Sequence, residues 1–533
     1  MAESALSITV PNGSVLPSGD VPRYRVDGVD RMTPFFMSLV GPGDGWAFVS
    51  SSGAITAGRG SPEHALFPYL TDDQLLDTVG RSGSSTTITL GSDATGTVWT
   101  PFARDTADDP QIRRAVEKTL LSDEIVLEER HTGWALCWRV SWRHSPSHGL
   151  VRSATLTREA GKTGAAADPG KTLRVFIRDG VVNVLPPGVS TRTQRQLSNL
   201  LDAYKLTELD RGRRLAWTRL NSGLTDLAEP CESLLASTVW LAGMPEATLL
   251  VDPDRPDAGQ RRGARGQLLA AARLTLVPGE TRQWSMVLDV DRDAAQVADL
   301  RAALVEPERH WEAVQLDLQR ARDTLSALVE SADGLQSTGD LAASAHHTSS
   351  VLFNVMRGGV PADGATVHRV DVEAFLEQRR LGLATVAAPL LDQLPETATL
   401  SALGALAEQA QDVDLRRLLG SYLPLTFSRR HGDPTRPWNT FSIQVADASG
   451  RPSLRYEGNW RDIFQNWEAL AYSFPDLLDP MIRTFLDAMT IDGYNPYRIA
   501  TEGVDWEVPE PDNPWSNIGY WSDHQVPYLT AAA

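Results

Sequence analysis

Three segments of the chain combine aromatic side chains with arginine, aspartate, asparagine and glutamine. They lie at residues 428–439, at residues 456–468 and between residues 492 and 525. An aromatic face covers the C–H patches of a sugar ring, and the polar side chains make paired hydrogen bonds to adjacent hydroxyl groups. Cleavage of a glycosidic bond also requires a carboxyl group that donates a proton. The three segments therefore predict a site that binds and cleaves a glycan.

The second and third segments resemble the catalytic core of glycoside hydrolase family 94, which contains the cellobiose and chitobiose phosphorylases. The resemblance rests on Trp460-Arg-Asp-Ile-Phe-Gln465, on the apolar helix that follows it, on Asp492-Gly-Tyr-Asn-Pro-Tyr-Arg498 and on Trp521-Ser-Asp523. It is specific over residues 456–525, and the order of domains is similar to that of the family along most of the chain. The resemblance implies inverting cleavage of a β-linked oligosaccharide, by phosphorolysis to a sugar 1-phosphate. Inorganic phosphate is then the co-substrate, and no cofactor or metal is expected.

The resemblance also implies roles for individual residues. Asp523 matches the acid that protonates the leaving glycosidic oxygen. Arg461 and Asp462 match residues that hold the sugar next to the cleaved bond, with Gln465 nearby. The other candidate substrate-binding residues are Arg436, Trp438, Trp460, Tyr497, Arg498, Trp521 and His524.

Asp523 needs a raised pKa if it is to stay protonated near neutral pH. Trp515, Tyr520 and Trp521 are candidates for the desolvation that raises the pKa of a carboxyl group. The alternative role for Asp523 is a helix N-cap, because the residues after it begin a helical pattern. The family commonly has paired aspartates here, whereas this chain has Ser522-Asp523-His524, so His524 is a candidate contact for phosphate or sugar.

Three alternatives to phosphorolysis follow from the same residues. Inverting hydrolysis needs a second carboxylate about 6.5–9.5 Å from the acid, and Glu457, Glu468 and Glu502 are the candidates. A non-catalytic carbohydrate-binding or assembly subunit would use the N-terminal domain as its recognition surface. A purely structural interpretation treats the tryptophans as fillers between helices and the charged residues as surface ion pairs.

The N-terminal half must position these segments, and its pattern predicts strands. Residues 1–290 show a hydrophobic period of two interrupted by clusters of glycine, proline, aspartate and serine, which is typical of a large β-sandwich. The clearest strands are residues 86–90, 135–142, 173–177 and 283–289. We expect a β-sandwich of the supersandwich kind over residues 1–290.

Helical patterns dominate the rest of the chain. Residues 291–339 are rich in alanine, leucine, glutamate and arginine, and they predict a linker of two helices divided at Pro307. Residues 340–533 predict the N-terminal part of an (α/α)6-barrel catalytic domain. The expected helices there are residues 341–356, 372–394, 400–419, 460–472 and 480–489. The fold class is therefore α+β and multidomain, with a β-sandwich, a helical linker and the first half of an (α/α)6 barrel.

The length of the helical part bears on whether a barrel is complete. Twelve helices of about 12 residues with loops of about 5 require roughly 200 residues before any long loop is added. Residues 340–533 carry only six or seven helical patterns, so we expect a barrel truncated within the catalytic domain. A second polypeptide that completes the barrel, or a homo-oligomer, is the expected partner.

Composition excludes several other classes of protein. The chain has 533 residues with 50 Lys and Arg against 68 Asp and Glu, so its net charge is −18 and it should not bind nucleic acid or an anionic membrane.

Its two cysteines, Cys137 and Cys231, exclude a disulfide framework and a thiolate metal site. His346 and His347 could ligate a metal, but ordinary helix positions are the better interpretation. The N-terminus shows no signal-peptide pattern, so we expect a cytoplasmic protein.

Overall fold

The computed structural model describes residues 11–16, 21–91, 96–106, 108–160, 172–221, 235–429, 432, 434–435, 441–447, 450–506 and 526–533. The chain forms two compact units. The first unit comprises residues 1–323 with 432–440, and the second comprises residues 324–431 with 441–533.

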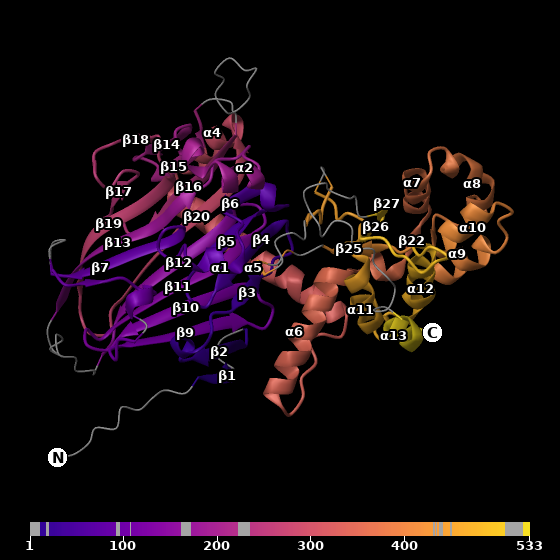
Figure 1. The fold of residues 1–533 in the computed structure, drawn as a ribbon, viewed down its shortest axis with the longest axis horizontal. Helices are drawn as coiled ribbons and strands as arrows, with labels where there is room; N and C mark the ends of the chain where they lie inside the picture. Colours follow the sequence, from indigo (N-terminus) through magenta and orange to yellow (C-terminus); the bar gives the residue numbers. More distant parts are fainter. Residues whose placement is uncertain are drawn as a thin grey trace. The chain divides into compact units, whose positions relative to one another are not determined.

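The first unit is built around an antiparallel sheet of eleven strands (Figure 1). Each strand pairs antiparallel with its neighbours. Strands β9 to β12 follow one another along the chain as hairpins joined by short turns, whereas β2 with β9 and β12 with β20 are joined by long connections. In sheet order the strands are β1 (Asn12–Leu16), β2 (Arg23–Asp27), β9 (Ile112–Thr119), β10 (Glu124–His131), β11 (Leu136–Ser145), β12 (Gly149–Arg158), β20 (Thr281–Asp293), β16 (Leu235–Gly243), β15 (Leu215–Leu220), β14 (Lys205–Asp210) and β18 (Gln260–Arg262).

Two smaller sheets belong to the same unit. The five-stranded sheet runs β17 (Thr248–Leu250), β19 (Gly266–Leu276), β13 (Leu173–Val184), β7 (Gly83–Leu90) and β8 (Val98–Trp99). The four-stranded sheet runs β3 (Phe36–Leu39), β4 (Gly45–Ser50), β5 (Ile55–Arg59) and β6 (Ala65–Phe67). Short helices α1 (Asp72–Leu76), α2 (Thr191–Gln196) and α3 (Ser198–Asp202) lie in the connections.

One hydrophobic core joins the three sheets. Alternate residues of β11, such as Trp138 and Trp142, contribute to it from the large sheet. Ile177 of β13 and Phe67 of β6 contribute from the smaller sheets. Since successive side chains of a strand point to opposite faces, this alternation is the period of two that predicts strands in the sequence. The expected mixed α+β architecture with a large antiparallel sheet domain is confirmed.

Two helices follow the last strand of the large sheet. α4 (Ala294–Ala303) begins with a capping box between Asp293 and Gln296, and α5 begins at Pro307 and ends at Ser331. Proline suits the first turn of a helix because its missing N–H has no partner there, so the division at Pro307 is confirmed. Val314 and Leu318 of α5 share a small core with strands of the large sheet.

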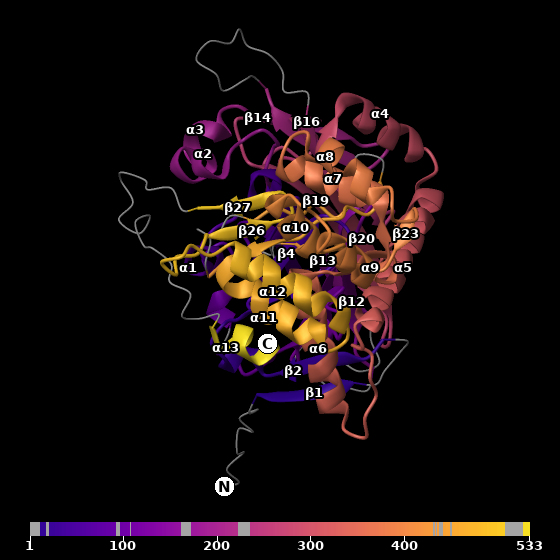
Figure 2. The same ribbon diagram turned by 90° about the vertical axis from the view of Figure 1, so that its right-hand side faces the viewer.

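The second unit consists of helices and short strands (Figure 2). Figure 2 shows α11 and α12 side by side, and their residues share one core. The helices are α6 (Leu341–Gly358), α7 (Arg369–Arg379), α8 (Leu383–Leu391), α9 (Leu400–Ala407), α10 (Val413–Gly420), α11 (Trp460–Ala471), α12 (Leu478–Asp487) and α13 (Val526–Ala532). The strand pairs are β21 (Val360–Pro361) with β24 (Leu425–Thr426), and β22 (Val367–His368) with β23 (Thr397–Ala398). A third small sheet joins β25 (Glu457–Asn459), β26 (Arg498–Ala500) and β27 (Gly503–Asp505).

Two of the expected helices are each divided in the structure. The segment expected as one helix over residues 372–394 breaks between α7 and α8, where Gly382 takes a left-handed conformation with φ of 79°. Glycine adopts this conformation without the steric cost of a Cβ atom, and it therefore ends one helix and allows the next to begin. The segment 400–419 breaks before Asp412, whose side chain accepts hydrogen bonds from the first backbone N–H groups of α10. In the described part of the chain, no helix is both long and apolar enough to cross a membrane.

Candidate functional site

Helix α11 carries the central segment of the expected site. Its apolar face is buried and includes Ile463, Phe464 and Trp467. Trp460 also lies in this core, where its ring stacks on Phe485 at a centroid distance of 4.3 Å. This face follows the three- and four-residue spacing of an amphipathic helix.

The other side of α11 presents polar side chains that are only half-buried. Asp462, Gln465 and Glu468 follow one another along it. Asp462 lies in the first turn, where its carboxylate accepts a hydrogen bond of 3.1 Å from the Asn459 amide group. A negative charge in the first turn of a helix is stabilised by the helix dipole. The start of α11 therefore holds one of the expected sugar-binding residues in a fixed position.

The small sheet of β25, β26 and β27 brings two of the expected segments together. In the pairing of β25 with β26, Asn459 lies opposite Arg498. The backbone N–H of Trp460 donates to the carbonyl of Tyr497 at 3.2 Å. Tyr497 itself is half-buried, and its backbone N–H donates to Asp505 at 2.8 Å. Residues 456–468 and residues 492–498 therefore meet at the beginning of α11.

The first residue of β25, Glu457, carries a buried carboxylate. Glu457 is only 2% exposed, and both of its carboxylate oxygens are engaged. Oε1 accepts a hydrogen bond from Arg498 at 2.7 Å, while Oε2 accepts from Arg455 at 3.1 Å and from Ser442 at 2.8 Å. A buried carboxylate is stable only when its charge is paired in this way.

The two arginines connect Glu457 to the exposed edge of the sheet. Arg455 also donates to Glu502 at 3.1 Å, and the Nε of Arg498 donates to Asp505 at 2.6 Å. Burial alone would lower the pKa of Arg498, but the hydrogen bonds to Glu457 and Asp505 outweigh it and raise the pKa above its usual value. The result is a row of alternating charges, which offers both donors and acceptors to a neutral polyhydroxyl ligand.

The first expected segment begins beside the same carboxylate. Ser428 accepts a hydrogen bond of 3.4 Å from the backbone N–H of Glu457 and donates to the carbonyl of Arg357 at 2.9 Å. Arg429 is buried, and its backbone N–H donates to Met356 at 2.9 Å. Parts of all three segments that the sequence singles out therefore lie in one unit, around the start of α11.

Several expected site residues lie outside the described residues. These are Arg436, Trp438, Trp521, Asp523 and His524, and the side chain of Arg461 also belongs to this group. Their roles remain predictions. Among the residues that the structure describes, no group of three or more histidine, cysteine, aspartate or glutamate side chains could hold a metal ion. His347 instead forms a hydrogen bond of 2.8 Å with the carbonyl of Asp333.

Sequence reasoning did not identify Arg455 and Ser442 as part of this site. Arg455, Glu457 and Asn459 alternate along an extended segment, so their spacing was a usable signal for one face of a strand. Ser442 carries no such signal, because its contact with Glu457 depends on how the intervening loop folds.

Part of the second unit matches a protein-family model. Residues 363–424 match the model of glycoside hydrolase family 149 insertion domain 1. Helices α7 to α10 lie within this segment. The match supports a glycoside hydrolase- or phosphorylase-like protein, and it does not single out family 94.

Solved structures give similarities that cover most of this chain. A protein assigned as a kojibiose phosphorylase from the human microbiome has 8% identity and a TM-score of 0.30, covering 93% of this chain and 54% of that one. A bacterial glucoamylase complexed with acarbose has 11% identity and a TM-score of 0.35, covering 91% and 62%. A family GH92 α-mannosidase from Bacteroides thetaiotaomicron has 8% identity and a TM-score of 0.27, covering 92% and 57%.

The chain spans 54% and 62% of the lengths of the first two of these proteins. A comparison with curated proteins finds no match.

Proposed function

We propose that the chain is a carbohydrate-active enzyme that cleaves a β-linked oligosaccharide with inversion, by phosphorolysis to a sugar 1-phosphate. The class of activity rests on one observation, the match of residues 363–424 to a glycoside hydrolase family domain. The candidate site around the start of α11 supports the same class, because it gathers carboxylate, amide and guanidinium groups suited to sugar hydroxyls.

The proposed reaction needs one proton donor and one nucleophile. Asp523 donates its proton to the glycosidic oxygen as the bond from that oxygen to the anomeric carbon breaks. An oxygen of inorganic phosphate attacks the anomeric carbon from the opposite face, so a β-glycoside yields an α-sugar 1-phosphate and a shortened sugar with a free hydroxyl. Arg461 and Asp462 hold the sugar ring during this step, and the hydrogen bond from Asn459 fixes the Asp462 carboxylate.

The contacts of Glu457 and Glu502 argue against two of the three candidate bases for hydrolysis. Hydrolysis with inversion requires a carboxylate that is free to activate a water molecule. Both oxygens of Glu457 are bound by arginine or serine, and Glu502 is paired with Arg455. Phosphate needs no such base because it is already an anion. Glu468, the third candidate base, lies on the half-buried side of α11.

The test is an incubation of the full chain with cellobiose or N,N′-diacetylchitobiose, with and without inorganic phosphate. We expect a sugar 1-phosphate that forms only with phosphate and disappears in Asp523→Asn. Asp476→Asn, at an acidic residue of the same unit outside the site, is the matched control and should retain turnover. Unchanged turnover in Asp523→Asn would exclude this residue as the acid.

The other outcomes separate the alternatives. Reducing sugar that forms equally well without phosphate would show inverting hydrolysis instead. Binding of the same sugars by calorimetry without any product would show a carbohydrate-binding subunit. A chain that neither binds nor cleaves these sugars contradicts the proposal for this substrate class.

A further inference from the structure

Two histidines of the first unit meet where α5 packs on the large sheet. His148 lies in the turn between β11 and β12, and His310 lies in the first turn of α5. Their rings meet edge to face at a centroid distance of 5.1 Å. The His310 ring also lies 5.3 Å from the ring of Trp240, which is buried in β16. Helix, turn and sheet are therefore joined by one aromatic cluster.

Both imidazoles are held in the neutral form near pH 7. Burial lowers the pKa of His148 and of His310, and the neighbouring His148 lowers that of His310 further. The Nε2 atom of His310 is buried and has no hydrogen-bond partner among the described residues. A neutral imidazole tolerates such a position far better than a cation does.

The charged groups around the pair come from several elements. Asp317 faces His148 from α5, Asp289 and Arg292 face it from β20, and Arg59 faces it from β5. These two acids and two bases oppose one another, so burial decides the charge of His148. The charged group acting on His310 is His148 itself.

Solvent can reach the two rings. A cavity of about 250 Å³ is lined by both histidines and by Asp299 and Gln296 of α4, and these polar groups suit water molecules. Protons therefore have a path to the imidazoles without unfolding of the sheet.

The contacts beside the pair hold the beginning of α5 on the sheet. The Asp317 carboxylate accepts a hydrogen bond of 3.0 Å from the backbone N–H of Ser147, in the same turn as His148. Val314 and Leu318 pack into the small core with Trp240. Helix α5 continues beyond residue 323, where the second unit begins.

We propose that His148 and His310 form a proton-operated latch, which holds the first half of α5 on the large sheet when both rings are neutral and releases it when both are protonated. Two cations at this ring contact repel each other, and each loses hydration in a partly buried position. The latch is closed at neutral pH and opens in acid. This inference does not depend on the proposed function.

Hydrogen exchange of the full chain tests the latch. The opening constant of amides in residues 310–322 is measured as a function of pH and corrected for the intrinsic exchange rate. Below about pH 6.5, the ordinary pKa of histidine, opening is coupled to the uptake of two protons. The opening constant should therefore rise by up to about a hundredfold for each unit by which the pH falls. His148→Gln or His310→Gln should reduce the slope to about tenfold per unit, and the control His346→Gln, at an exposed position of α6, should leave it unchanged.

A slope that is the same in the two single variants and in the wild type overturns the proposal. A second measurement needs no substitution. In the wild type, the imidazole proton signals of His148 and His310 should titrate below about pH 6.5, and they should do so over the same range in which α5 opens. Titration of either ring at its ordinary pKa would equally contradict the latch.

Discussion

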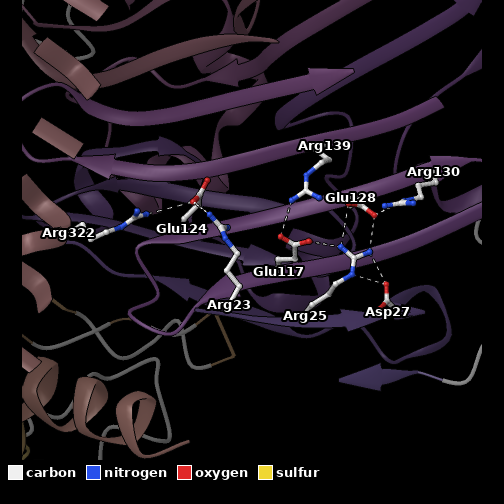
Figure 3. A network of polar contacts seen from close by, with 9 residues as sticks. All are labelled: Arg23, Arg25, Asp27, Glu117, Glu124, Glu128, Arg130, Arg139 and Arg322. Atoms are coloured by element: carbon white, nitrogen blue, oxygen red, sulfur yellow. Dashed lines mark hydrogen bonds and ion pairs between the residues drawn. The ribbon is translucent and has the colours of Figure 1, made fainter. Parts of the chain in front are cut away.

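Glu128 of the first unit and Glu457 of the second unit are both buried carboxylates that pair with arginines. Glu128 of β10 is 1% exposed and accepts hydrogen bonds from Arg25 at 2.8 Å and from Arg130 at 2.8 Å. Arg139 of β11 donates to its other oxygen. Figure 3 shows these side chains converging across neighbouring strands of the large sheet, with Glu117 between Arg25 and Arg139.

Glu457 of the second unit has similar partners in a different setting. Arg498 belongs to β26 of the small sheet and Arg455 lies just before β25, and the two arginines also pair with the exposed carboxylates of Glu502 and Asp505. Glu128 is held by long strands whose register fixes every partner, so its network serves the fold. Glu457 lies in β25, whose last residue Asn459 precedes α11 and donates to Asp462, so its network borders the candidate site. Pairing of a buried carboxylate with arginines therefore stabilises the fold in the first unit and supports the candidate site in the second. Substitutions in the two networks should have different effects on stability and on activity.

The largest loss of stability should come from the fully buried ion pair of the first unit. Arg152 and Asp179 are both 0% exposed, and Arg152 donates to both oxygens of Asp179 at 2.6 and 2.8 Å. Arg152→Met leaves the Asp179 charge without its partner, and we expect a loss of about 3–5 kcal/mol in the free energy of unfolding. Denaturant unfolding of the sheet unit measures it.

The double variant Arg152→Met with Asp179→Asn is the control. It removes both charges and should recover part of the loss, because no unpaired charge then remains buried. A loss below about 1 kcal/mol in the single variant would show that this pair does not hold the core.

The next effect is a pH dependence in the same unit. Burial alone would raise the pKa of Glu128, but hydrogen bonds from Arg25 and Arg130 outweigh it and lower the pKa to about 2. Because the pKa of an unfolded glutamate is about 4.3, the stabilisation is complete above that pH and is lost as the pH falls toward 2.

The expected contribution is on the order of 3 kcal/mol. It is measured as the difference between wild type and Glu128→Gln in unfolding experiments at pH 7 and pH 2.5. The difference should shrink strongly at the lower pH. A difference that does not change with pH would mean that the charge of Glu128 plays no part in stability.

The next effect is smaller, and it separates Glu457 from Glu128 by their influence on catalysis. Glu457→Gln removes the negative charge that pairs with Arg455 and Arg498. If these arginines shift out of place, kcat/KM for phosphorolysis should fall by about ten- to hundredfold, because a misplaced binding group no longer orients the substrate. Glu128→Gln, in the first unit, should leave kcat/KM unchanged although it lowers stability. Equal kinetic effects of the two variants, or none from Glu457→Gln, would remove the distinction drawn between the two networks.

The smallest expected effect compares two glycines of the second unit. A Cβ atom at Gly382 or at Gly404 would meet no atom within 4 Å, but only Gly382 has a left-handed backbone. Gly382→Ala should therefore cost about 1 kcal/mol, whereas Gly404→Ala, within α9, should stabilise by about 0.5–1 kcal/mol. Thermal unfolding measures both. Shifts of the same sign would contradict the helix break at Gly382.

Elements with a strong periodic signal could be predicted from the sequence. The expected strand over residues 135–142 corresponds to β11, and the expected helix over residues 341–356 corresponds to α6. Pro307 marks the start of α5 because its chemistry acts locally. Gly382 and Asp412 are also local signals, but they lie inside long apolar patterns that favoured continuous helices.

Contacts between distant parts of the chain could not be predicted in the same way. Glu457 and Arg498 are 41 residues apart in the sequence, and their pairing depends on the register of β25 and β26, which share no periodic signal. Candidate base residues therefore looked alike in the sequence. Only the fold shows that Glu457 is an ion-pair partner, while Glu468 keeps a half-buried position on α11.

The most direct test of the central claim is a ³¹P NMR spectrum of the full chain incubated with cellobiose and inorganic phosphate. The account predicts a growing signal of α-glucose 1-phosphate, matched by the loss of inorganic phosphate and absent in Asp523→Asn. Release of glucose with an unchanged phosphate signal would contradict phosphorolysis as the function of this site.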